Sequence, residues 1–253
     1  MKVLILGGTG LLGTMFCDQM SKLGIVALPI GRSTKNNFKI GQKANRALFE
    51  EIDVVIYLSW MFDTTKKNYI DDNFNSLKEV LEICKFKNIK LFFASTVFAS
   101  ESAASKYNIA KGSCEKLVLE YNQKIIKFGA VFDEIYQDRG FYGKILLFYK
   151  KFKFLPKILP NKKIFYKTNT DDISNFLKQF LTSKKNIYRC YQSPPEKMVD
   201  IFNFRKKILT IPIPWFVLYI ILKSFEILKF NIGFRSDSIL SIWGKSGVNE
   251  KIS

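Results

Sequence analysis

Short, largely apolar runs recur along the first half of the chain and alternate with amphipathic segments. Val3–Leu6, Ile25–Ile30, Asp53–Ser59 and Leu91–Ala94 are such runs and predict strands, of which Val3–Leu6 and Asp53–Ser59 are expected to be buried in a sheet. Strands of this kind, separated by helices, form a parallel sheet with right-handed crossovers. The pattern therefore predicts an α/β fold built on a Rossmann-like doubly wound parallel sheet.

Helical periodicity marks the segments between these strands. A helix is predicted over Leu11–Leu23, and a second over Asp71–Phe86, where apolar residues recur at helical spacing. Ser105 can cap a third helix that runs over Lys106–Tyr121. These helices supply the crossovers that a parallel sheet requires.

Other segments give shorter patterns. A strand at Phe38–Ile40 followed by a helix at Lys43–Glu51 fits the ambiguous stretch after the second strand. Further along, the pattern predicts a helix over Asp171–Thr182 and a strand over Asn186–Cys190. Asn231–Ser253 shows no pattern that we can assign.

A glycine-rich loop directly follows the first strand. Glycines allow a tight turn and let a pyrophosphate approach the backbone, and the helix that begins there offers free N–H groups and the positive end of its dipole. The alternative is a glycine-rich turn that binds no ligand. We expect the cofactor to contact this loop and the end of the strand at 53–59, through Gly7, Thr9, Gly10, Leu11, Leu12, Gly13, Leu58 and Ser59.

The residue after the second strand bears on the choice of cofactor. An NAD-binding unit of this type places an Asp or Glu there to accept the adenosine ribose hydroxyl, whereas this chain has Gly31, Arg32 and Ser33. A guanidinium beside a hydroxyl suits a 2′-phosphate, so we favour NADP(H) over NAD(H). The alternative is that Arg32 stacks on the adenine or faces solvent.

The composition restricts the chemistry. The chain has no histidine, which excludes Ser-His-Asp and Cys-His catalysis and leaves Tyr, Lys, Asp, Glu or Cys for acid–base work. The cysteines lack metal-type spacing, so we interpret them as reduced thiols. The first strand begins at residue 3, and we therefore expect no secretory signal and a cytoplasmic protein.

The net charge of +18 has three interpretations. Lysines on solvated faces are the first, and attraction to an anionic membrane surface is the second. Nucleic-acid binding is the weakest of the three, because the lysines are spread along the chain and no nucleic-acid motif accompanies them. We therefore expect no nucleic-acid partner.

Tyr107 and Lys111 lie four residues apart on the helix predicted at 106–121, on one face and one turn from each other. A nearby ammonium favours the phenolate and lowers the phenol's pKa from its ordinary value of about 10. Such a phenol can exchange a proton with a hydroxyl or carbonyl next to a nicotinamide. Ser95 or Thr96, at the end of the preceding strand, can hold the same oxygen.

These residues resemble the extended short-chain dehydrogenase/reductases, in particular the NAD-dependent epimerase/dehydratase family acting on nucleotide sugars. The likeness covers residues 1–180 approximately. It rests on the glycine loop, the strand at 53–58 with Tyr57 in place of the usual His, Asn73, Ser95-Thr96, Tyr107-x-x-x-Lys111 with Glu115, and the strand at 125–132 with Lys127 in an Arg position. The resemblance implies that Tyr107 is the acid/base, that Lys111 modifies its pKa and anchors the ribose, and that Ser95 or Thr96 is the oxygen clamp.

Departures from the family's pattern narrow the reaction. Val97-Phe98 follows Thr96 where the family's 4,6-dehydratases carry Asp-Glu, and the Cys-His scheme of its reductase-epimerases lacks a histidine here. A 4-keto reduction or a C4 epimerisation remains. The stretch from Thr96 to Tyr107 is also shorter than usual, which leaves open whether Ser95 or Thr96 points at the substrate.

The C-terminal third is basic, aromatic and apolar. In the family, Gly140–Pro160 belongs to the substrate lobe, where lysines and aromatics can hold a diphosphate and a base; the alternative is a helix with lysines outside. Ile211–Phe230 is the most apolar segment, and its run from Trp215 to Leu222 is too short to span a bilayer. We favour a buried helix of the substrate lobe over an interfacial helix with Lys223 near the headgroups.

The sequence thus predicts an NAD(P)-binding domain over residues 1–135, and over 136–253 a segment that completes the sheet and forms the substrate lobe. The resemblance implies a nucleotide-sugar oxidoreductase or epimerase that serves surface polysaccharide synthesis, and a homodimer. Two rivals stay open. One is a peripheral enzyme at the inner face of the membrane that acts on a lipid-linked sugar, and the other is a non-catalytic NADP(H)-binding subunit.

Overall fold

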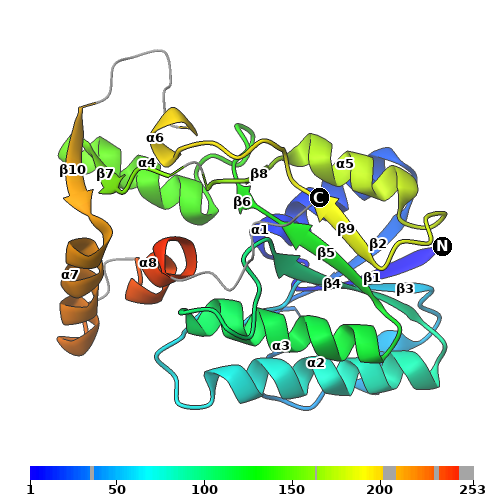
Figure 1. Cartoon of the computed structure of the whole chain (residues 1–253). Helices are drawn as coiled ribbons and strands as arrows, with labels where there is room; N and C mark the ends of the chain where they lie inside the picture. The colour runs from blue at the N-terminus through cyan, green and yellow to red at the C-terminus, as the bar shows by residue number, and fades with distance from the viewer. Residues whose placement is uncertain (35–36, 163, 202–208, 231–233, 245–253) are drawn as a thin grey trace.

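The computed structural model of the chain describes residues 1–34, 37–162, 164–201, 209–230 and 234–244. A six-stranded parallel sheet in the order β2-β1-β3-β4-β5-β9 forms its centre (Figure 1). The strands are β1 (Lys2–Leu6), β2 (Val26–Ile30), β3 (Val54–Tyr57), β4 (Lys90–Thr96), β5 (Lys124–Phe128) and β9 (Ile187–Cys190). The predicted doubly wound α/β fold is confirmed.

Helices cover both faces of the sheet because its inner strands β1, β3 and β4 are apolar on both sides, whereas the edge strand β2 is largely exposed. The face with α2 (Tyr69–Phe86) and α3 (Lys106–Glu120) encloses one hydrophobic core, and the face with α1 (Leu11–Lys22) and α5 (Thr170–Gln179) encloses another. β1 lies between β2 and β3, so the order of the strands reverses beside it. Ligands of open α/β sheets bind at this reversal point, outside the carboxyl ends of the strands.

A smaller lobe adjoins the carboxyl ends of the strands (Figure 1) and has a hydrophobic core of its own. It pairs β7 with β10 in parallel and includes short helices. Its elements are α4 (Gly140–Phe152), β7 (Leu155–Leu159), α6 (Met198–Ile201), β10 (Thr210–Pro214), α7 (Trp215–Ile227) and α8 (Ser236–Trp243). A two-stranded pair, β6 (Ala130–Val131) with β8 (Lys167–Thr168), connects the lobe to the sheet. The domain boundary at residue 135 stays a prediction.

Two sequence predictions fail between β2 and β3. Residues 38–40 form no strand, and the helix expected at Lys43–Glu51 is only a 3-10 turn, η1 (Arg46–Phe49). Phe38 and Phe49 are instead buried as single side chains in the core beside α2. β2 is consequently the edge strand of the sheet.

The apolar segment at 211–230 also differs from expectation. Its first residues form β10, and α7 begins only at Trp215. Within α7, all of whose residues are described, Leu222 is the buried residue. The prediction of a buried helix is therefore wrong, because the lobe is too small to enclose every side of α7. In the described part of the chain, no helix is long and apolar enough to cross a membrane.

Candidate active site

The glycine loop lies at the reversal point of the sheet, between β1 and α1. The N–H groups of Gly7 and Gly8 both donate to the carbonyl of Ile30, over 2.7 and 3.0 Å. Gly7 has φ +89°, and a Cβ added to it would lie 2.7 Å from the backbone nitrogen of Ser59. A Cβ on Gly13 would lie 2.5 Å from the carbonyl oxygen of Gly7.

The loop therefore forms a cradle of bare backbone at the start of α1. This fits a dinucleotide, whose pyrophosphate needs close approach to backbone N–H groups at a helix N-terminus. The predicted contact residues on the loop lie together, and Leu58 and Ser59 lie beside Gly7. Arg32 follows Gly31, whose added Cβ would meet the Thr9 side chain, so Arg32 lies next to the loop with its own side chain exposed.

Arg139 is a residue of this region that the sequence analysis missed. Its guanidinium donates to the carbonyl of Thr9 over 3.3 Å and to the hydroxyl of Thr14 over 3.2 Å. The next residue, Gly140, approaches Leu11 closely. The chain before α4 thus brings a positive charge to the glycine loop. An Arg-Gly pair directly before an apolar helix was the available signal.

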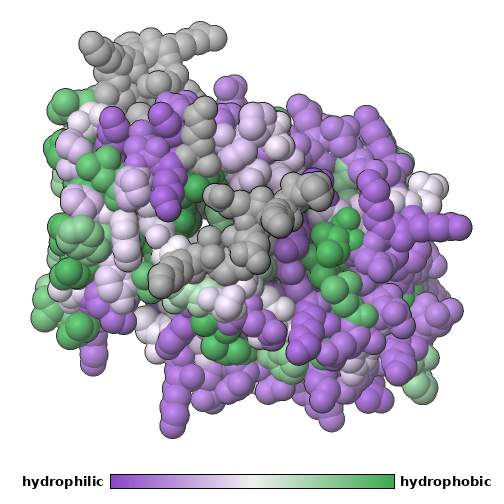
Figure 2. All heavy atoms as spheres, viewed as in Figure 1, coloured by the Kyte–Doolittle hydropathy of each residue, from purple (hydrophilic) through white to green (hydrophobic). Residues whose placement is uncertain are grey.

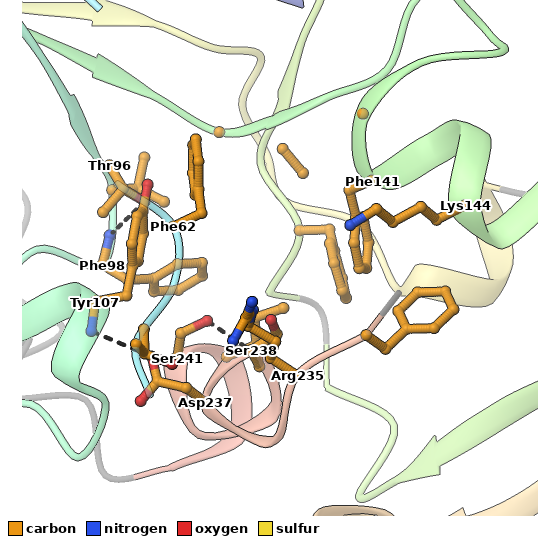
Figure 3. A pocket seen from close by; sticks show the side chains of 18 of the residues that line it. Phe62, Thr96, Phe98, Tyr107, Phe141, Lys144, Arg235, Asp237, Ser238 and Ser241 are labelled. Carbon is orange, nitrogen blue, oxygen red and sulfur yellow. Dashed lines mark hydrogen bonds between the residues drawn. The ribbon is translucent and has the colours of Figure 1, made fainter. Parts of the chain in front are cut away.

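A cavity of about 440 Å³ lies between the sheet and the lobe, and Thr96 and Tyr107 both line it (Figure 3). Ser95 is only 4% exposed, and among the described residues its hydroxyl has no hydrogen-bond partner. The structure therefore brings Thr96, rather than Ser95, to the cavity with the phenol. Aromatic and basic side chains make up much of the remaining lining, which also includes the carboxylate of Asp237; they are Phe62, Phe98, Phe141, Lys144, Phe165, Tyr166, Phe234 and Arg235.

Tyr107 lies in the first turn of α3, and two caps fix that turn. The hydroxyl of Ser105 accepts the N–H of Asn108 over 3.0 Å, as predicted. The carboxylate of Asp237, from α8, accepts the N–H groups of Lys106 and Tyr107 over 2.9 and 3.2 Å. The chain segment that carries the phenol is thereby held by the lobe across the cavity.

Aromatic rings surround the phenol. The ring of Phe62 stacks on Tyr107 at 6.3 Å between centroids, and Trp60 meets it edge-on at 6.1 Å. Burial raises the pKa of Tyr107 to about 12. The expectation that Lys111 lowers this pKa is thus wrong for the side-chain arrangement seen here, in which burial dominates.

Lys111 follows one helical turn later and is only 5% exposed. Its ammonium donates to the carbonyl of Ala94 over 2.6 Å, and it lies 3.6 Å from the ring centre of Trp60 and 4.6 Å from that of Phe93. Desolvation lowers the pKa of Lys111 to about 7. The described residues contain no cluster of His, Cys, Asp and Glu suited to a metal ion.

Residues 3–131, half of the chain, match the sequence model of the NAD dependent epimerase/dehydratase family. The chain belongs to this family. A search of curated proteins finds no match.

Solved structures of similar fold include enzymes of different reactions. UDP-glucuronic acid 4-epimerase from Bacillus cereus, in complex with NAD, has a TM-score of 0.68 at 18% identity over 96% of this chain and 95% of that one. dTDP-glucose 4,6-dehydratase from Bacillus anthracis, also with NAD, has a TM-score of 0.67 at 16% identity over 85% and 84%. ADP-L-glycero-D-manno-heptose-6-epimerase from Helicobacter pylori has a TM-score of 0.66 at 15% identity over 84% and 85%. The shared fold does not select the reaction.

Three residues that the sequence analysis compared with the family's pattern lie outside the cavity, in the elements around it. Asn73, buried on α2, accepts the N–H of Met61 over 3.0 Å and so fixes the loop after β3. Glu115 of α3 pairs with Lys127 of β5 at 3.0 Å. Tyr57, which replaces the family's histidine, buries a hydroxyl that finds no partner in the described part of the chain.

The cap on α3 gives a first prediction. Asp237→Ala removes both acceptors from the start of this helix and should lower stability by about 1 kcal/mol, and we expect kcat to fall roughly tenfold because Tyr107 is no longer held in place. Thermal unfolding and steady-state kinetics measure the two effects. Asp71→Ala, at the exposed start of α2, is the matched control. An unchanged kcat in Asp237→Ala would contradict the positioning role.

The buried ammonium gives a second prediction. Because the pKa of Lys111 is about 7 in the folded protein and about 10.4 in an unfolded chain, the unfolded state binds more protons between these values. The free energy of unfolding should therefore rise with pH from about 7 to about 10. Lys111→Met should remove this rise and stabilise the protein by about 3 kcal/mol near pH 7.

Chemical denaturation at several pH values measures this difference. Lys116→Met, at an exposed position of the same helix, should keep the wild-type dependence on pH. Equal slopes for Lys111→Met and wild type would show that the ammonium is not destabilised by burial.

Proposed function

We propose that this family member uses a nicotinamide dinucleotide to epimerise or reduce C4 of a nucleotide-activated sugar. The observation that carries the proposal is the cavity that Thr96 and Tyr107 both line, together with Gly140, which lies against Leu11 at the start of α1. Lys111 lies one turn from Tyr107, as a dinucleotide-dependent proton relay requires. The bound nicotinamide would supply the acceptor or donor of a hydride.

The residues of the chain perform the remaining tasks. Backbone N–H groups of the glycine loop and the dipole of α1 would hold the pyrophosphate, and Lys111 would anchor the ribose once Trp60 moves away from its ammonium. Tyr107, in its deprotonated phenolate form, takes the proton of the C4 hydroxyl during oxidation and returns it during reduction, while the Thr96 hydroxyl holds the same substrate oxygen. Phe62 covers the phenol and limits access of water.

The lining of the cavity supports a nucleotide sugar as the substrate. Lys144 and Arg235 bring positive charge for a diphosphate, although Arg235 already pairs with Asp63 at 2.6 Å, and aromatic rings offer surfaces for a sugar face and a base. The solved structure from Bacillus cereus also exists with UDP-glucuronic acid and NAD. We therefore propose a UDP- or dTDP-hexose. Dehydration is not proposed, because Val97-Phe98 follows Thr96.

The preference for NADP(H) over NAD(H) depends on Arg32. The two similar enzymes from Bacillus described above were solved with NAD, and they lend no support to NADP(H). The preference for NADP(H) therefore rests on the guanidinium next to the loop. If the guanidinium of Arg32 binds the 2′-phosphate, the substitution Arg32→Ala should raise the Kd of NADPH at least tenfold and leave the Kd of NADH unchanged. Equal changes for both cofactors would remove the preference. Fluorescence titration measures both constants.

The wider setting is also a proposal. A nucleotide-sugar enzyme of this kind would serve surface polysaccharide synthesis in the cytoplasm, as a homodimer through α2 and α3. A non-catalytic NADP(H)-binding subunit is the rival that a specific observation favours, because the ring of Trp60 covers the ammonium of Lys111 at 3.6 Å.

A turnover assay distinguishes the nucleotide-sugar enzyme from the non-catalytic subunit. The purified protein is incubated with a panel of UDP- and dTDP-hexoses and their 4-keto forms, with NAD or NADPH, and the products are identified by chromatography and mass spectrometry. We expect inversion at C4 or consumption of NADPH. A protein that binds the dinucleotide and turns over none of the panel would support the rival.

A further inference from the structure

The outer side of α7 exposes a stripe of large apolar side chains. Phe216, Ile220 and Ile227 recur at helical spacing and are 52%, 58% and 72% exposed. Ile221 and Leu228 lie next to the stripe and are exposed as well. Monomeric proteins rarely leave such a contiguous patch to water unless it binds something.

Neighbouring elements of the lobe extend this surface. Ile211 of β10 and Leu147 and Phe152 of α4 are exposed apolar residues, and β10 pairs with β7, against which α4 packs. Figure 2 shows apolar side chains gathered along the edge of the molecule that α7 and β10 form. We name these residues, with those of α7, the lobe surface.

The charges around the lobe surface are almost all positive. Residues 140–162 and 209–230 contain eight lysines and one acid, Glu226. Glu226 is turned inward, where it accepts the N–H and hydroxyl of Ser236 and pairs with Lys223 at 3.5 Å. Lys150 and Lys151 are exposed on α4. Lysines beside an apolar stripe can place their ammonium groups at lipid phosphates while the stem stays with the apolar atoms.

We propose that the lobe surface docks the protein on an anionic phospholipid bilayer, with α7 lying in the interface. An apolar helical face bordered by lysines is the arrangement that binds anionic lipid. A second copy of the chain fits less well, because it would bring the same lysines against each other. Docking of this kind is peripheral and independent of the reaction in the cavity.

Sedimentation with vesicles tests the proposal on the full chain. We expect the protein to sediment with vesicles of phosphatidylglycerol and phosphatidylethanolamine, and not with phosphatidylcholine alone. Phe216→Ser combined with Ile220→Ser and Ile227→Ser should weaken this binding at least tenfold. Leu23→Ser with Leu28→Ser and Phe86→Ser, on exposed positions of the main domain, is the matched control and should bind like wild type.

Charge reversal supplies the second arm. Lys150→Glu with Lys151→Glu should weaken binding about tenfold, and Lys184→Glu with Lys185→Glu, an exposed pair between α5 and β9, should not. Sedimentation equilibrium without vesicles gives the oligomeric state of the wild type and of each variant. Absence of binding at low salt, equal binding by both serine variants, or a dimer that only the α7 variant dissociates would each overturn the proposal.

Discussion

Tyr107→Phe should lower kcat by about three orders of magnitude and leave the Kd of the nicotinamide cofactor within twofold of wild type. The variant keeps the ring that packs against Phe62 and Trp60 and loses only the oxygen that exchanges a proton with the substrate. General acid–base catalysis contributes a factor of about 10² to 10⁴. The chain has no histidine that could take over.

Steady-state kinetics on a substrate found in the panel, with fluorescence titration of the cofactor, measures both quantities. Tyr121→Phe, at the other end of the same helix, is the control and should keep full activity. If Tyr107→Phe were as active as wild type, another group would have to be the acid/base. Loss of cofactor binding together with activity would instead indicate a structural role for the phenol.

Gly13→Val should raise the Kd of the cofactor by about 100-fold. The added Cβ would lie 2.5 Å from backbone atoms of Gly7 and Gly8, so the loop and the start of α1 must move apart. A misplacement of about 1 Å can cost about two orders of magnitude in catalytic rate, and we expect a loss of similar size in the affinity of this binding cradle. The effect is backbone displacement, and no side chain can relax to relieve it.

Gly24→Ala separates this effect from general destabilisation. Gly24 lies just beyond the other end of α1 with φ +67° and has open space around it, so alanine strains the backbone there without touching the loop. We expect a small loss of thermal stability and an unchanged Kd in this control. Tight cofactor binding by Gly13→Val would mean that the cofactor does not use the glycine loop.

Local patterns predicted the first half of the fold well. The strand, loop and helix at the N-terminus each have a signal within a few residues, and they are found where expected. The segment at 38–51 failed because Phe38 and Phe49 satisfy the core as isolated side chains without pairing to β2. The apolar run of α7 predicted a helix correctly and its burial incorrectly. A run of apolar residues does not indicate how many sides of the helix the rest of the lobe covers.

In the candidate site too, local patterns predicted some features, while others depended on the tertiary structure. The helical spacing of Tyr107 and Lys111 could be read directly, whereas the direction of the pKa of Tyr107 depended on the surrounding rings. The choice between Thr96 and Ser95 required the orientation of the strand end. Asp237 lies 130 residues away from the N–H that it caps, and no local pattern connects the two.

A UDP-hexose that carries deuterium at C4 tests most directly whether the hydroxyls in the cavity serve hydride transfer at the nicotinamide. We expect a primary isotope effect on turnover, and deuterium either retained at C4 of the epimerised product or recovered on the nicotinamide. Conversion of the sugar with deuterium released to water, and none on the nicotinamide or at C4, would contradict the account.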